Sequence, residues 1–217
     1  MSEMARDDVE AVVAAARKKN ERAKLRGANL TRVPVPVYEA NLKGADLSGA
    51  DLTGANLTWV SLTGANLTGA NLQGVLSWEI AGKPAALPPG WLLIEGYLVG
   101  PGAKLYGAKL RGADLTDVNL TGVNLGNADL EGTSLRGAIL TGTNLEDANL
   151  TEANLADDPM TLIDHEVPEV RAWAAQRITD PTVLMQLALD DEEVVRAAVL
   201  ENGSATDEIR VAVTLRQ

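Results

Sequence analysis

The stretch from Ala103 to Leu155 decides the fold, and it reads AKLYG AKLRG ADLTD VNLTG VNLGN ADLEG TSLRG AILTG TNLED ANLTE ANL. A leucine returns at every fifth residue of this stretch, and a second run keeps the same spacing from Leu42 to Leu72. A period of five is neither the period of two of a strand nor the 3.6 of a helix. The chain keeps every fifth residue inward only if it turns a corner once in each unit. We therefore expect each unit to form one short side of a coil.

The residues around each leucine support this interpretation. Alanine stands two residues before most of the leucines, Asp or Asn directly before them, and Thr, Ser, Arg or Gly after them. Leucine and alanine would fill the interior, and glycine would ease the corners. Thr133 and Thr143 replace the small inward alanine, so their hydroxyl groups should need a backbone acceptor. Ile139 replaces the usual Asp or Asn and should face outward.

These units resemble the A-(D/N)-L-x-x repeats of pentapeptide repeat proteins. The resemblance covers roughly residues 23–155 and implies a right-handed, four-sided parallel β-helix with four units in each coil. Residues 20 apart would then stack on one another. Such a stack is one-dimensional, and its two ends need to be covered.

Three regions follow from this reading, and the fold class is mainly β. Residues 1–22 predict an amphipathic helix that caps the β-helix. Residues 23–155 form the β-helix itself, interrupted at 33–39 and 73–102. Residues 156–217 are predicted to be an α-helical repeat domain, because the pattern from Val170 returns from Val195 at an offset of 25 residues. This last region resembles leucine-rich-repeat-variant or HEAT-like repeats.

The interruption at 73–102 contains Trp78, Trp91 and Tyr97, three of the seven aromatic residues of the chain. Its sequence WLLIEGYLV predicts two short strands around Glu95-Gly96. The segment either folds back and covers one side of the rod, or projects and binds a partner. Trp59 faces outward by its register and is a further candidate for a contact.

Composition and charge exclude most catalytic chemistry. The 217 residues include no cysteine and one histidine, His165, so the usual ligand sets of a zinc site are missing. No cofactor or metal is expected, and no spacing of residues indicates an enzyme. The net charge of −11 argues against direct binding of nucleic acid or of an anionic membrane surface. No segment is long and apolar enough to span a bilayer, and we expect a cytoplasmic protein.

The function expected on this basis is that of a scaffold for an unidentified protein partner. Its expected contact residues are Trp59, Trp78, Trp91 and Tyr97, together with the acidic run Asp190, Asp191, Glu192 and Glu193. The resemblance implies an alternative, because several bacterial pentapeptide repeat proteins mimic DNA, bind DNA gyrase and give fluoroquinolone resistance.

A DNA mimic needs a continuous negative stripe, and the charge of this chain is unevenly divided. Residues 21–157 hold 14 acids and 10 bases, whereas residues 158–217 hold 12 acids and five bases. The sequence leaves open whether the chain is a monomer or a dimer.

Overall fold

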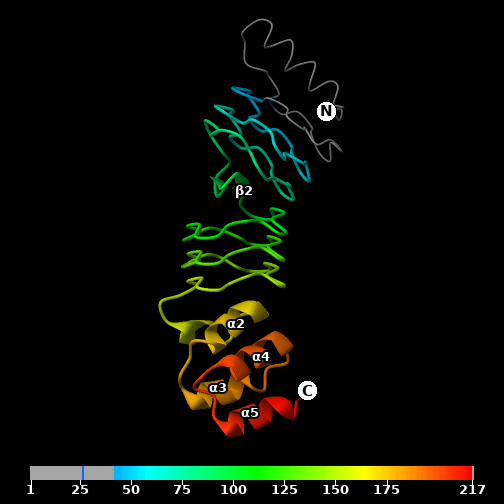
Figure 1. Cartoon of the computed structure of the whole chain (residues 1–217). Coiled ribbons are helices and arrows are strands. Elements are labelled where there is room, and N and C mark those ends of the chain that lie inside the picture. Colours follow the sequence, from blue (N-terminus) through cyan, green and yellow to red (C-terminus); the bar gives the residue numbers. More distant parts are fainter. Residues whose placement is uncertain (1–25, 27–41, 217) are drawn as a thin grey trace, which may run out of the picture.

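The computed structural model describes residue 26 and residues 42–216, which form a rod of stacked coils followed by four α-helices (Figure 1). The regular elements are β1 (Leu92–Ile94), β2 (Tyr97–Val99), the 3-10 helix η1 (Pro159–Leu162), α2 (Pro168–Ala175), α3 (Pro181–Leu187), α4 (Glu193–Glu201) and α5 (Asp207–Thr214). The helix expected over residues 1–22 and the interruption at 33–39 lie outside the described residues.

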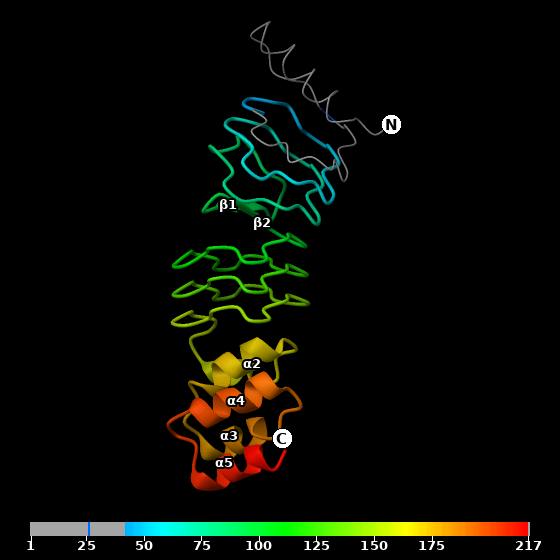
Figure 2. The same cartoon turned by 45° about the vertical axis from the view of Figure 1, so that its right-hand side comes forward.

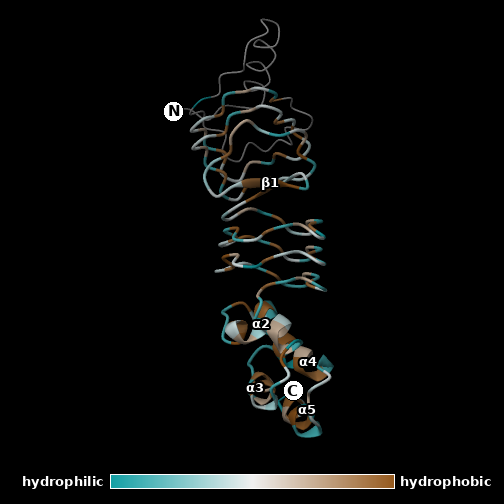
Figure 3. Ribbon diagram, turned by 90° about the vertical axis from the view of Figure 1, so that its left-hand side faces the viewer, coloured by the Kyte–Doolittle hydropathy of each residue, from teal (hydrophilic) through white to brown (hydrophobic). Residues whose placement is uncertain are grey.

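Parallel backbone pairing joins residues 20 apart, as the repeat predicts. Asp46 pairs with Asn66, and Lys104 pairs with Asn124, which pairs in turn with Asn144. Units of five residues in coils of 20 give four sides to each coil. The leucines point inward and are buried, and Figure 3 shows apolar and polar residues alternating over short distances along the coils.

The exceptions to the repeat behave as their chemistry predicts. The hydroxyl of Thr133 donates to the carbonyl of Leu110 at 2.9 Å, and that of Thr143 donates to Leu120 at 2.8 Å. Both expectations of a backbone acceptor are thus confirmed. Ile139 is 49% exposed, which confirms its outward position.

The break in the repeat is shorter than the leucine pattern indicates. Leu76 and Ala86 still pair with the coil before them, at the regular offset of 20. Ser77 and Gly82 stand in this coil at two positions where the repeat would have leucine. A search for leucine at every fifth residue therefore does not detect that the coil continues. Leu76 then pairs with Lys104, 28 residues on, so the next coil contains eight extra residues. A β-hairpin of eight residues, made of β1, β2 and the turn Glu95-Gly96, supplies them.

This hairpin lies between two stacks of coils, residues 42–91 above it and 100–155 below it, whose planes are inclined to each other (Figures 1 and 2). The Ile80 N–H of the upper stack donates to Gly96 at 3.0 Å, and the Lys109 N–H of the lower stack donates to the Tyr97 hydroxyl at 3.1 Å. Direct strand pairing between the stacks is found only at Leu76 and Lys104 among the described residues. The hairpin therefore separates the stacks everywhere except along that side.

The helical region closes the lower end of the rod. Trp173 of α2 is buried, and its indole N–H donates to the Ala153 carbonyl of the last coil at 2.8 Å. The Glu166 carboxylate accepts from the Gly142 N–H at 2.8 Å. In the preceding coil, the backbone groups equivalent to the Gly142 N–H and the Ala153 carbonyl form hydrogen bonds to the next coil. The Gly122 N–H, for example, donates to the carbonyl of Thr141. Two side chains thus substitute for a coil that is not there, and the apolar core runs on from the coils into the helices.

The four helices pack together around α4. α2 packs chiefly on α4, and α3, α4 and α5 all contact one another. The Arg171 guanidinium donates to the carbonyls of His165 and Glu166, and Arg196 donates to those of Asp190 and Asp191, also six and five residues earlier. Within the described part of the chain, no helix is long and apolar enough to cross a membrane.

Candidate functional site

Three exposed aromatic side chains form a strip along one edge of the rod. The Trp59 N–H donates to the Trp78 carbonyl on the next coil at 3.0 Å. Trp78 and Tyr106 each follow a residue of the Leu76–Lys104 pair by two positions, so they occupy the same place on successive coils. The exposed fractions of Trp59, Trp78 and Tyr106 are 41, 39 and 65%. We call these three residues the aromatic strip.

Two members of the strip were expected from the sequence, and Tyr106 was not. Tyr106 lies next to Trp78 only because the inserted segment has a certain length, and the spacing of the leucines does not give that length. If Val75 and Ile80 are assigned to the inward positions usually held by alanine, the repeat continues past Leu72 and the length of the insertion can be counted. Both residues are buried, as that assignment requires.

The two other aromatic candidates lie inside the junction. The Trp91 ring packs against the cores of both stacks, and a β-carbon at Gly100 would lie only 2.4 Å from it. Tyr97 packs against the lower core, and its hydroxyl accepts the Lys109 N–H. The segment is therefore built into the rod between the two stacks, and these two side chains contribute to the packing of the junction.

The acidic run divides into one largely buried residue, Asp190, and three exposed ones. Asp190 and Arg171 form a double hydrogen bond, both contacts at 2.9 Å, with 13 and 15% of their side chains exposed. Burial alone would raise the pKa of Asp190, but the hydrogen bonds from Arg171 and from the Glu192 N–H outweigh it and hold that pKa below its ordinary value. Asp191 is exposed and pairs with Arg216, and Glu192 and Glu193 are exposed at the start of α4.

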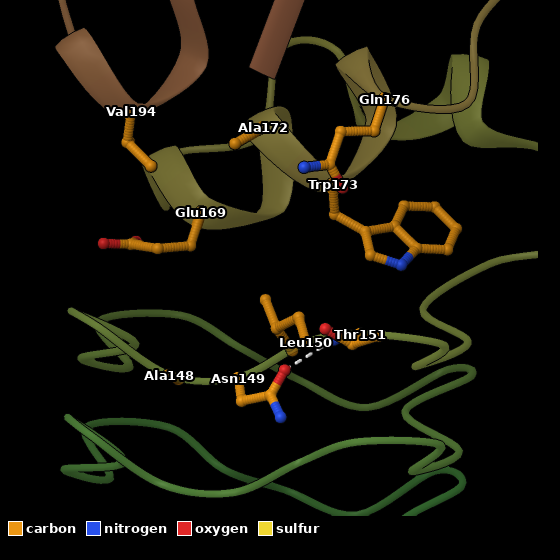
Figure 4. Close-up of a pocket in the computed structure, with 9 residues that line it drawn as sticks. All are labelled: Ala148, Asn149, Leu150, Thr151, Glu169, Ala172, Trp173, Gln176 and Val194. Carbon is orange, nitrogen blue, oxygen red and sulfur yellow. Dashed lines mark hydrogen bonds between the residues drawn. The ribbon is translucent and has the colours of Figure 1, made fainter. Parts of the chain in front are cut away.

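Two grooves of the described surface lie where the last coil meets the helices. One, of about 250 Å³, lies between residues 148–151 of the last coil and α2 (Figure 4). A second, of about 680 Å³, lies between residues 142–146 and the starts of α2 and α4. The carboxyl-bearing residues that line the second groove are Glu146, Glu166, Glu169, Glu192 and Glu193. Sequence reasoning singled out only two of these five, since the others come from separate parts of the chain.

The histidine and the repeated Asp and Asn side chains take part in local hydrogen bonds. His165 is half-buried, its Nδ1 accepts the Val167 N–H at 3.1 Å, and burial lowers its pKa. No group of three or more His, Asp or Glu side chains in the described part of the chain is arranged to hold a metal ion. The Asp and Asn side chains of the coils accept N–H groups two residues on, as Asp114 does from Thr116 at 3.0 Å. These side chains are therefore engaged in hydrogen bonds within their own coils.

Comparison with known proteins identifies the coils. The model of the family "Pentapeptide repeats" matches eight copies, over residues 40–76, 102–137 and 128–157. The family forms right-handed, four-sided β-helices, which agrees with the 20-residue pairing. A search of curated protein sequences finds no match to the chain.

Solved structures of similar proteins include two pentapeptide repeat proteins and a fluoroquinolone resistance protein. Rfr23 from the cyanobacterium Cyanothece 51142 is 26% identical, with 67% of this chain and 96% of that chain covered and a TM-score of 0.24. HetL from Nostoc, involved in regulating heterocyst differentiation, is 33% identical over 61% of this chain and 64% of its own, with a TM-score of 0.19. The plasmid-mediated fluoroquinolone resistance protein QnrB1 is 19% identical over 62% of each chain, with a TM-score of 0.24.

Proposed function

The chain belongs to the pentapeptide repeat family through its coils, and we propose that it is a non-catalytic scaffold that binds another protein. The observation that carries this proposal is the aromatic strip of Trp59, Trp78 and Tyr106. Tryptophan and tyrosine dominate the binding energy of many protein interfaces, because they bury large areas and lose little conformational freedom. A strip of this kind on an otherwise polar rod is suited to contact with an apolar patch of a partner.

Trp59 lies at a corner of its coil, where its side chain is directed away from the core. Its φ angle is 60°, in a position that glycine holds in neighbouring units such as Gly54 and Gly64. Asp117, Asn127 and Asp147 hold the same position with φ angles of 58°, so the left-handed backbone belongs to the repeat and is not in itself a sign of function. A large ring that is 41% exposed does little for the core, so we attribute its presence to a contact.

The alternative of a DNA mimic fits the described surface less well. A mimic needs an unbroken run of negative charge, and basic side chains interrupt the acids of the lower coils. Arg111 pairs with Asp129 and Glu131, and Arg136 pairs with Asp157. A supercoiling assay with DNA gyrase and an excess of the purified chain separates the two functions. We expect unchanged gyrase activity, and inhibition or protection would favour the mimic.

The test of the scaffold replaces two of the three residues of the strip, Trp78 and Tyr106. Threonine stands at the corresponding place in other units, at Thr116 and Thr121, so the double variant Trp78→Thr/Tyr106→Thr should fold. Ile139→Asn, which removes an exposed apolar side chain elsewhere and restores the usual residue, is the matched control. Quantitative affinity purification from the native host should recover one defined protein with the wild type and the control, but not with the double variant. Equal recovery with all three chains would refute the role of the strip.

We also propose that α2–α5 are two units of a helical repeat. The support is the matching pair of contacts made by Arg171 and Arg196, 25 residues apart. If so, each arginine fixes the loop that leads into its own unit.

A further inference from the structure

The last coil of the rod has an edge that the helices cover only in part. In the preceding coil, the N–H groups of Leu125 and Leu130 donate to Asn144 and Asn149 at 2.8 and 3.0 Å. The carbonyls of Val123 and Ala128 likewise accept from the N–H groups of those two asparagines, both at 2.9 Å. Each side of a coil thus offers one set of donors and acceptors to the coil below it.

The equivalent groups of the last coil have no such partner. They are the N–H groups of Leu145 and Leu150 and the carbonyls of Thr143 and Ala148, and no hydrogen bond within the described chain satisfies them. This contrasts with Gly142 and Ala153 of the same coil, whose edge groups bond to Glu166 and Trp173. These open groups lie on two adjoining sides, residues 143–147 and 148–152, and the N–H of Leu140 on the side before them is likewise without a backbone partner in the described chain.

Both open sides line grooves whose opposite walls are formed by α2 and the start of α4. Figure 4 shows the gap between Leu150 and Thr151 below and Glu169 and Gln176 of α2 above. The larger groove beside it runs along Thr143, Leu145 and Glu146. Unpaired strand edges that lie next to free space are the places where extended peptides add to a sheet.

The walls of the larger groove define what it would accept. Val167, Pro168 and Val194 give it an apolar part, and Val194 is 42% exposed. Its charged lining consists of glutamates alone, with neither Lys nor Arg among the lining residues. An occupant with Lys or Arg side chains would pair with these carboxylates, whereas an acidic one would be repelled.

We infer that the open edge of the last coil binds an extended segment of a partner protein that carries Lys or Arg. The segment adds to residues 143–147 as one further strand, with its backbone paired to Thr143 and Leu145. Its basic side chains meet the glutamates at the starts of α2 and α4. Glu146 lies two positions after Asn144, which pairs through Asn124 with Lys104, so this groove and the aromatic strip share one edge of the rod. The binding does not depend on the strip and goes beyond the scaffold function.

Three synthetic peptides of eight residues test the inference on the full chain. The first alternates valine and lysine, the second is the same peptide with alternate backbone nitrogens methylated, and the third alternates valine and glutamate. We expect the first to bind, more weakly as salt rises, and the second to bind at least about tenfold more weakly because it lacks ladder hydrogen bonds. The third should not bind. Failure of the first peptide to bind, or equal binding of the first and second, overturns the proposal.

Two variants of equal charge locate the site. Glu169→Gln/Glu193→Gln should weaken binding of the valine–lysine peptide by about fivefold or more. Asp164→Asn/Glu208→Gln makes the same change of charge outside the groove and should leave the affinity unchanged. Hydrogen exchange of the Leu145 amide should slow when the peptide binds, which attraction by charge alone would not cause. Unaltered exchange of the Leu145 amide overturns the inference. Self-association of the chain also overturns it if the peptide competes with that association and the groove variant abolishes it, because the edge would then bind a second copy of the chain.

Discussion

Deletion of the hairpin residues 92–99 should straighten the rod. The deletion joins Trp91 to Gly100 and places Leu87 and Leu105 ten residues apart, a multiple of five. The eight residues removed are those by which the Leu76–Lys104 pairing exceeds the regular offset of 20. We therefore expect the shortened chain to fold as a continuous β-helix, in which Ala81 pairs directly with Lys109.

The expected change in shape follows from the spacing of strands. The hairpin separates the stacks on the side of Ile80 and Lys109, whereas Leu76 and Lys104 already pair directly. Removing it should bring the two stacks closer on the open side by about 5 Å, one strand spacing. The side of Leu76 should change much less.

Because the chain has no cysteine, pairs of spin labels report these distances without further changes. Thr63→Cys with Thr151→Cys spans the junction on the open side, and both positions are exposed. Trp78→Cys with Glu146→Cys spans it on the paired side and serves as the control. A folded deletion variant in which the first distance is unchanged would show that the hairpin does not set the inclination, and an unfolded one would show that the insertion is not a removable addition.

A second substitution checks the same reasoning through stability. The Ser77 hydroxyl accepts a hydrogen bond from the N–H of Leu98, which is fully buried. Leu98 thus occupies the space that a leucine side chain at position 77 would fill. Ser77→Leu should lower the melting temperature of the full chain. In the deletion variant, which lacks Leu98, it should raise the melting temperature. The same sign in both backgrounds would refute the account of the junction.

Three further predictions concern the lower half of the chain. Trp173→Phe keeps the packing of α2 but leaves the Ala153 carbonyl without its donor, so urea denaturation should show a loss of about 1–3 kcal/mol; an unchanged midpoint would mean that water replaces the indole. Thr143→Val keeps the side-chain shape and removes one buried hydrogen bond, which should cost about 1 kcal/mol in the same assay, and a stabilised variant would contradict this. Asp190 has a folded pKa below its unfolded one, so it stabilises the fold above pH ~4 and that contribution is lost as pH falls through the folded pKa. Asp190→Asn should therefore be less stable at pH 7 and should lose less stability than the wild type on acidification, and parallel pH profiles would exclude this role.

The coils were predictable from the sequence because their information is local. A leucine at every fifth residue specifies one side of a coil, and the side chains of Thr133 and Thr143 need only the coil beside them. The junction was not predictable in the same way, because Ser77 and Gly82 hold leucine positions and their meaning depends on Leu98, which packs from a distant part of the sequence.

The candidate sites show the same division. Trp59 and Trp78 were found from their register, since register decides which way a side chain faces. Trp91 and Tyr97 belong to a segment without a repeat, so nothing in the sequence decided whether they face the solvent or the core. The pairing of Asp190 with Arg171 joins the connection between α3 and α4 to α2, across 19 positions of sequence, and no periodicity in the sequence indicates it.

The way in which Trp173 and Glu166 end the coils also bears on how such rods change length. Every coil presents the same pattern of donors and acceptors to the next, so the stack itself contains no signal to stop. The stop lies in two side chains outside it, which would fit the edge of any coil in the same register. Gain or loss of 20 residues would then lengthen or shorten the rod by about 4.8 Å without reshaping either end. The number of coils thus sets the distance between the parts attached to the two ends of the rod, and evolution can change that distance in steps of one coil without changing the attached parts.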